Sequence, residues 1–415
     1  MGPVVAWTFL TAIAVAGGVF FAVWSLLNAQ GLKAEPKLSS STLFDLVKLS
    51  FGVVAGAGAL VALVVAYRRQ RVDEDGALRE DTRLHTERFT AAVSQLGAES
   101  VAVRLGGVHA LAGLADDAPT RELRQTCIDV LCAYLRLPYT AETDLPQGDA
   151  DAHHAYLALR EVRHTVIRLI RDHLCLTPDH PDSWQGHDLD FTGVVFDGGD
   201  FDRATFSGGR ISFIGAEFLG GQVSFGLARF SGGTVVFADA EFSGGQVNFG
   251  GAEFSGGQVS FDGAKFSGST VLFGAATFSR SRVTFGDAEF SGGTVFFGGA
   301  EFSGGTVLFG GAKFSGSTVL FGGATFSGGQ IFFGGAEFSG GTVFFGGATF
   351  SGGQVSFGDA EFSGSRILFG DAEFSGGTVD FSAAVGAMPS GGLATSDNPR
   401  PAGLILPQAW LTPTP

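Results

Sequence analysis

The pattern of apolar and polar positions changes twice along this chain of 415 residues. Two long uncharged runs lie before residue 68, and apolar residues then recur at helical spacing from Leu78 to Leu174. Phenylalanines spaced by five or seven residues follow, as far as Phe381. We expect a membrane α-hairpin, a small α-helical domain, a solenoid of short strands and a tail, over residues 1–72, 73–180, 187–385 and 386–415.

The two uncharged runs, Val4 to Leu27 and Leu49 to Tyr67, predict a pair of transmembrane helices that use the lipid bilayer as a partner. Each is just long enough to cross about 30 Å of hydrocarbon, and Trp7 and Trp24 suit the two headgroup levels. Basic residues set the orientation, because they favour the cytoplasmic side. Five arginines follow the second run, against three lysines between the runs: Arg68, Arg69, Arg71, Arg79 and Arg83, against Lys33, Lys37 and Lys48. We expect a multi-pass protein of the cell membrane, with both termini and the repeat region in the cytoplasm.

Residues 73–180 are expected to form about four helices, with stops at Gly97 and Pro138 and an N-cap at Thr120. The stretches Val103 to Asp117 and Arg124 to Tyr139 resemble one paired-helix unit of the armadillo or HEAT kind, a fold that presents binding surfaces. One such unit does not bury its own apolar face. A small packing or oligomerisation domain therefore explains the pattern at least as well.

Phenylalanines at a constant spacing of five open the third region, at Phe191, Phe196, Phe201 and Phe206. This stretch resembles the pentapeptide-repeat family, whose units carry a small residue at i−2 and Phe or Leu at i, as Ala204 and Phe206 do here. The resemblance implies a right-handed, four-sided β-helix. Together with the two predicted transmembrane helices, it indicates a membrane-anchored bacterial member of the family. After Phe206 every second unit looks extended by two residues, AEFSGGT alternating with VFFGG, which makes an atypical 12-residue repeat.

Side-chain alternation independently predicts a phenylalanine core. If each Phe points inward, the residue two before it also points inward, and that residue is small, as with Ala252 before Phe254. Gly-Gly and Ser-Gly pairs fall where the chain must turn. Stacked coils about 4.8 Å apart would then bury a core ladder. The ladder is expected to include Phe254, Phe261, Phe266, Phe273, Phe278, Phe285, Phe290, Phe297, Phe302 and Phe309.

The residue before each Phe should point outward, so its chemistry tests the coil length. With coils of 24 residues, one column is apolar: Leu272, Phe296, Leu320, Phe344 and Leu368. Another is charged: Glu217, Glu241, Lys265, Glu289, Lys313, Glu337 and Glu361. A third is Thr and Glu, and the fourth is mixed: Thr277, Glu301, Thr325, Thr349 and Glu373; then Ser260, Thr284, Leu308, Phe332 and Ser356. Coils of 12 residues would interleave these columns and leave too little interior for two phenylalanines, which favours 24. A 48-residue duplication, seen in residues 252–299 and 300–347, reproduces part of this sorting by itself.

The apolar column, called here the apolar stripe, is the candidate interaction surface. Five large side chains in a row along about 19 Å make a contiguous exposed patch. It either packs against this chain's own helices or tail, or contacts a protein partner or a second copy. The charged column is interpreted as a solvated face.

Composition narrows the remaining chemistry. A net charge of −15 argues against direct binding of nucleic acid, which needs a basic face. No motif of the P-loop, dinucleotide-binding, HExxH or GxSxG type predicts an enzyme or a cofactor. The scattered histidines are interpreted as surface residues and not as metal ligands: His153, His154, His164 and His173. Cys127, Cys132 and Cys175 are expected to be thiols in a reducing compartment.

These observations together predict a noncatalytic, membrane-tethered scaffold that presents its repeat region to a partner. The alternative follows from the family resemblance, because some pentapeptide-repeat proteins imitate duplex DNA and bind topoisomerases, and this chain is acidic. Lys265 and Lys313 within the acidic column argue against that alternative, as does a membrane tether.

Residues 386–415 are rich in proline and glycine, and most of them are expected to be disordered. The segment GLILPQAW, residues 403–410, is too apolar for a free tail. Because the last coil of a solenoid exposes an apolar end, this segment is a candidate cap.

Overall fold

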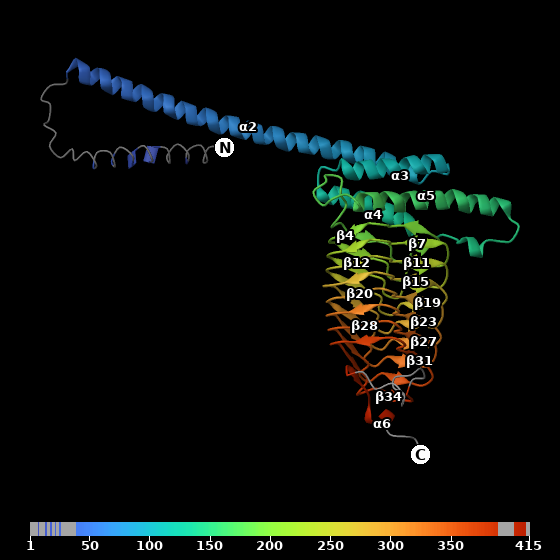
Figure 1. Ribbon diagram of the computed structural model, residues 1–415. Coiled ribbons are helices and arrows are strands. Elements are labelled where there is room, and N and C mark those ends of the chain that lie inside the picture. The colour runs from blue at the N-terminus through green and yellow to red at the C-terminus, as the bar shows by residue number, and fades with distance from the viewer. Residues whose placement is uncertain are drawn as a thin grey trace. The chain divides into compact units, whose positions relative to one another are not determined.

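The computed structural model (Figure 1) describes residues 39–388 and 402–411, together with isolated positions before residue 39. The chain divides into two compact units, Met1–Leu84 and His85–Pro415.

The first unit is dominated by helix α2 (Ser40–Leu96), which begins there and continues into the second unit. The predicted span Leu49 to Tyr67 lies within α2, and large apolar side chains such as Phe51 and Leu63 are exposed on it. The predicted span Val4 to Leu27 lies, apart from isolated positions, outside the described residues. No helix in the described part of the chain has the apolar length that a bilayer crossing requires, so the membrane hairpin finds no support here.

Four further helices of the described residues belong to the second unit: α3 (Val101–Asp116), α4 (Arg121–Leu135), α5 (Ala150–Leu174) and the short α6 (Gln408–Leu411) near the C-terminus. The 3₁₀ turn η1 (Glu142–Asp144) lies between α4 and α5. The predicted N-cap is confirmed, since the Thr120 hydroxyl accepts a hydrogen bond from Leu123 N at 3.3 Å. Leu111, Leu131 and Val166 form the buried centre of α3, α4 and α5. We call residues 85–174 the helical cap.

The third region is the predicted right-handed, four-sided β-solenoid of about eight coils. Within the described residues its strands form four parallel sheets, here named A to D. Sheet A is β1 (Leu189–Asp190), β5 (Arg210–Ser212), β9 (Thr234–Val236), β13 (Gln258–Ser260), β17 (Arg282–Thr284), β21 (Thr306–Leu308), β25 (Gln330–Phe332), β29 (Gln354–Ser356), β33 (Thr378–Asp380) and β35 (Leu404–Ile405). Sheet B is β2 (Val195–Phe196), β6 (Glu217–Phe218), β10 (Glu241–Phe242), β14 (Lys265–Phe266), β18 (Glu289–Phe290), β22 (Lys313–Phe314), β26 (Glu337–Phe338), β30 (Glu361–Phe362) and β34 (Val385–Gly386).

The other two sheets complete each coil. Sheet C is β3 (Gly199–Asp200), β7 (Gln222–Ser224), β11 (Gln246–Asn248), β15 (Thr270–Leu272), β19 (Thr294–Phe296), β23 (Thr318–Leu320), β27 (Thr342–Phe344) and β31 (Arg366–Leu368). Sheet D is β4 (Thr205–Phe206), β8 (Arg229–Phe230), β12 (Glu253–Phe254), β16 (Thr277–Phe278), β20 (Glu301–Phe302), β24 (Thr325–Phe326), β28 (Thr349–Phe350) and β32 (Glu373–Phe374). Each strand is only two or three residues long, because a corner follows it at once.

Strand pairing confirms the 24-residue coil. Phe296 pairs with Leu320 in sheet C, and Glu301 pairs with Thr325 in sheet D. The first coil is two residues shorter, since Leu189 pairs with Ile211. The constant spacing of five between the first four phenylalanines accounts for this difference.

The interior is filled by phenylalanine rings that stack from coil to coil. The ten predicted ladder residues are at most 2% exposed. Phe297 stacks on Phe273 and on Phe321, with ring centroids 4.8 Å apart in both cases. This spacing equals that of the paired strands, so backbone pairing and ring stacking are satisfied together.

Glycine is needed where one coil passes close to the next. Gly293 has a φ of +73°, and a Cβ there would overlap the carbonyl oxygen of Ser269 in the preceding coil. An L-residue at this corner would therefore be strained twice, by its own φ and by its neighbour.

Both ends of the solenoid are covered. At the first coil, α4 packs against β1 and α5 against β3, and the buried residues of the helical cap and the solenoid form one continuous cluster (Figure 1). At the last coil, β35 pairs with β33, and the Trp410 ring lies 5.6 Å from Phe362 and 5.7 Å from Phe381. The apolar end segment of the chain therefore covers the last coil.

Candidate functional site

The apolar stripe occupies consecutive outward positions of sheet C. Its five members pair in order along β15, β19, β23, β27 and β31: Leu272, Phe296, Leu320, Phe344 and Leu368. The alternating inward positions of these strands hold valine or isoleucine, such as Val295 and Ile367, which are buried. The sequence therefore placed the five side chains on one face correctly, and the described residues leave each of them partly exposed.

The rings of Phe296 and Phe344, the two phenylalanines of the stripe, are partly buried although they lie at outward positions. A Cβ at Gly298 would overlap the Phe296 ring, and a Cβ at Gly346 would overlap the Phe344 ring. Each ring therefore lies over a glycine of the corner that follows its strand. The stripe is therefore a row of partly buried apolar side chains that together form one continuous apolar surface.

The same column of sheet C begins with polar residues that the sequence analysis missed. Above Leu272 it continues through Asn248 and Ser224 to Asp200. The Asn248 amide donates to Ser224 Oγ at 3.3 Å, and the Ser224 hydroxyl donates to Asp202. Extending the 24-residue sorting towards the N-terminus would have found them. The outward face of sheet C is thus polar beside the helical cap and apolar farther along.

The other three outward columns also follow the predicted sorting. In the charged column of sheet B, Lys313 Nζ lies 4.0 Å from Glu289 Oε1 in the neighbouring coil. In sheet D, Arg229 Nε lies 3.4 Å from Glu253 Oε2. These exposed pairs contribute little to stability. They do make sheets B and D charged faces, in contrast to sheet C.

A buried carboxylate joins the helical cap to the first coil. Asp197 is 8% exposed and accepts hydrogen bonds from the hydroxyls of Tyr139 at 2.5 Å and Tyr156 at 2.7 Å. Arg160 Nε and His164 Nε2 each lie 3.5 Å from its oxygens. Burial alone would raise the pKa of Asp197, but hydrogen bonds from His164 and both tyrosines outweigh burial and hold the pKa well below its usual range.

A buried arginine reinforces the same junction. Arg163 donates to the carbonyl oxygens of Leu135 and Val195, both at 2.6 Å, and its guanidinium lies 4.1 Å from the centre of the Tyr139 ring. Its contacts therefore link the end of α4, the middle of α5 and strand β2. Arg136 and Asp190 form a further ion pair across the junction.

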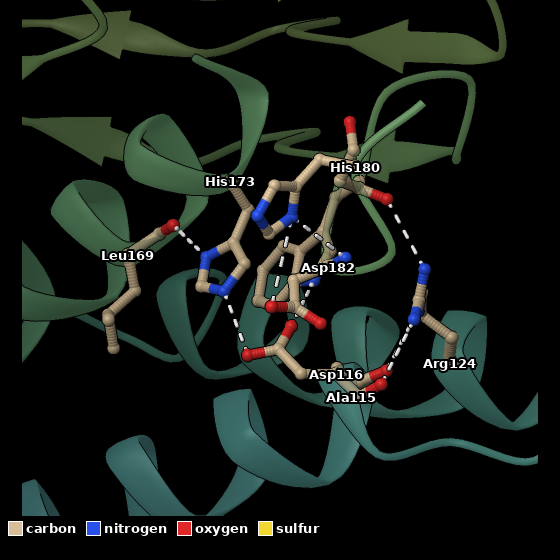
Figure 2. Close-up of polar contacts among 9 residues, drawn as sticks. Ala115, Asp116, Arg124, Leu169, His173, His180 and Asp182 are labelled. Carbon is tan, nitrogen blue, oxygen red and sulfur yellow. Dashed lines mark hydrogen bonds and ion pairs between the residues drawn. The ribbon is translucent and has the colours of Figure 1, made fainter. Parts of the chain in front are cut away.

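His173 connects the C-terminal end of α5 to α3 and to Trp184 (Figure 2). His173 Nδ1 donates to the Leu169 carbonyl at 2.6 Å and Nε2 to Asp116 at 3.1 Å, while the ring stacks on Trp184 with centroids 4.0 Å apart. Both partners are acceptors, so the arrangement suits the doubly protonated imidazolium. Burial opposes that charge, but the bonds to Asp116 and Leu169 raise the pKa of His173 above 6.5.

The prediction that the histidines are surface residues is wrong for His173, whose side chain is 12% exposed. His164 is also partly buried, beside Asp197. Their acidic partners, Asp116 and Asp197, are distant in sequence, so no local spacing indicated these contacts. Among the described residues, no group of three or more His, Cys, Asp or Glu is arranged to hold a metal. The arrangement of these groups is that of a structural junction.

Comparison of the chain with protein-family models, with curated proteins and with solved structures finds no match. The stacked parallel strands and the phenylalanine ladder are consistent with a pentapeptide-repeat β-helix.

Proposed function

We propose that this protein is a noncatalytic scaffold, related to the pentapeptide-repeat proteins, whose solenoid presents the apolar stripe to a protein partner or to a second copy of the chain. The observation that supports this most is the stripe itself. Five large apolar side chains lie in register on one sheet face, along about 19 Å of the solenoid, and each stays partly exposed among the residues that the structure describes.

The contrast with the other faces supports an interaction role. Sheets B and D carry charged outward residues, and sheet A mixes Ser, Thr, Leu and Phe. A row of apolar side chains beside charged faces is typical of a contact surface. The two lysines within the acidic column of sheet B, Lys265 and Lys313, do not favour the alternative of a DNA-mimicking topoisomerase regulator.

The test removes the stripe without touching the core. Changing Phe296, Leu320 and Phe344 to Ser should leave the circular dichroism spectrum unchanged and abolish self-association or co-purification of a partner. The matched control changes Leu308 and Phe332 of sheet A to Ser, which removes the same chemistry from another face and should leave association intact. The molar mass from light scattering distinguishes self-association of this chain from binding of a different protein. Association that survives the triple substitution would refute the proposal.

The membrane tether is a further part of the proposal and rests on the sequence. The uncharged run Leu49 to Tyr67 exposes large apolar side chains along α2, and the arginine cluster beginning at Arg68 follows it. With the cysteines Cys127, Cys132 and Cys175 replaced by Ser, a cysteine at Ser40 should react with an impermeant reagent on intact cells. A cysteine at Arg366 should react only after permeabilisation. Recovery of the protein in the soluble fraction, or the opposite labelling pattern, would contradict the tether as proposed.

A further inference from the structure

A groove of about 520 Å³ lies between helix α5 and the first strands of sheet C, next to the polar start of the stripe column. Four basic residues of α5 line one wall: Arg160, His164, Arg168 and Arg171. Strands β3 and β7 provide the other wall, which includes Asp200 and Gln222. Its volume is within the range of ordinary ligand sites.

The basic residues follow one face of the helix, because they are spaced by four, four and three positions. At a rise of about 1.5 Å per residue, the row from Arg160 to Arg171 extends over roughly 16 Å. The row is a local concentration of basic side chains in a chain whose net charge is −15.

The carboxylates of the groove are already occupied by internal donors. Asp200 accepts from Asp202 N at 2.8 Å and pairs with Arg171 Nη1 at 3.2 Å. Asp202 accepts from Gly226 N at 2.7 Å and from the Ser224 hydroxyl. The two carboxylates therefore bond mainly within the wall of the groove, and Arg171 is the arginine with which Asp200 pairs.

Two of the arginines, Arg160 and Arg168, retain guanidinium donors that form no hydrogen bond within the described residues. Arg168 is exposed and, among the described residues, forms no ion pair; its one hydrogen bond is to Thr165 Oγ1 at 3.3 Å. Arg160 approaches Asp197 through Nε at 3.5 Å, and in the described part of the chain its two terminal nitrogens form no hydrogen bond. Arginine forks of this kind match carboxylates in bidentate pairs.

The distance between the two arginines indicates the size of the ligand. Arg160 and Arg168 are eight positions apart, which is roughly 12 Å along the helix. A single phosphate or carboxylate does not span that distance, whereas an extended peptide of about four residues does. We propose that this groove binds an extended acidic peptide segment, whose carboxylates pair with Arg160 and Arg168.

This inference rests on the proposed function in one respect. Asp200 and Ser224 of the groove belong to the same outward column as Leu272, so a peptide that is acidic at one end and apolar at the other would continue onto the stripe. The groove would then anchor the partner and set its direction. The groove is testable separately, with a peptide that has no apolar residues.

The experiment measures fluorescence anisotropy of a labelled hexaglutamate peptide with the full-length protein in detergent. We expect saturable binding, with hexaglutamine at least tenfold weaker, and about tenfold weaker binding of hexaglutamate to the Arg168→Glu variant, the loss of roughly one charge-assisted pair. The matched control is Arg280→Glu, which reverses an exposed charge on the solenoid far along the sequence. Its affinity should be unchanged.

Three results would overturn the inference. Equal binding of hexaglutamate and hexaglutamine would exclude charge recognition, and an unchanged affinity in Arg168→Glu would place the site elsewhere. Displacement by inorganic phosphate at the peptide's own concentration would show a small-anion site. The serine variants of the stripe should bind hexaglutamate normally, so a failure of the stripe and a failure of the groove are distinguishable.

Discussion

The solenoid interior and the helical cap bury neighbouring parts of one continuous core in different ways. In the interior, the same contact recurs in each coil, as with the rings of Phe273, Phe297 and Phe321 at 4.8 Å. In the cap, single polar contacts such as those of Asp197 and Arg163 fix the junction. The repeated ring contact forms between any two stacked coils. A single buried polar group, in contrast, finds its hydrogen-bond partners in only one arrangement of the cap on the first coil. The cap therefore defines where the first coil begins.

The comparison predicts that the largest loss of stability comes from the ladder. Phe297→Ala removes a fully buried ring that stacks on both neighbours, and should lower the free energy of unfolding by about 3–5 kcal/mol. Glu301→Ala, at an outward position four residues on, should lower it by about 0.5 kcal/mol or less. Denaturant unfolding followed by circular dichroism measures both. Equal losses would mean that the inward and outward sides are assigned wrongly.

A smaller loss is expected at the junction. Asp197→Ala leaves two buried tyrosine hydroxyls without their acceptor and should lower the free energy of unfolding by about 2–3 kcal/mol. Glu253→Ala, which breaks an exposed pair with Arg229, should have an effect of about 0.5 kcal/mol or less.

Because the pKa of Asp197 is depressed in the folded protein, its contribution is present above the ordinary carboxyl pKa and is lost as the pH falls through the folded value. The difference between wild type and Asp197→Ala should therefore be constant above the ordinary carboxyl pKa and decrease as the pH falls below it.

The smallest effect is a pH dependence within the cap. The folded pKa of His173 is raised above 6.5, so its contribution of about 1 kcal/mol is complete below pH 6.5 and is lost as the pH rises through the folded pKa. Burial, then Arg121 and Arg124, lower the pKa of His187 to about 4, so its contribution is lost as the pH falls from 6.5 towards 4.

Unfolding of His173→Gln and His187→Gln between pH 4 and 8 separates the two histidines. The difference from wild type should decrease with rising pH for the first variant and with falling pH for the second. The same slope for both would show that at least one of these charge states is assigned wrongly.

Repetition also decides what the sequence could predict. The 24-residue coil, the inward phenylalanines and the stripe were predicted because each occurs many times at a fixed spacing, as with Phe296 and Leu320. The partners of Asp197 were not predicted, because Tyr139 lies 58 positions away and the contact occurs once. The ring of Phe296 lying over Gly298 was missed as well, since the spacing places a side chain on a face but does not give its rotamer.

The most direct test of the central claim asks which face of the solenoid touches another protein. A photo-crosslinking amino acid at Leu320 of sheet C is compared with the same residue at Leu308 of sheet A, in cells that produce the full chain. The account predicts a discrete crosslinked product from position 320 and none from position 308. Products of equal yield from both positions, or a product from position 308 alone, would contradict the assignment of sheet C as the contact surface.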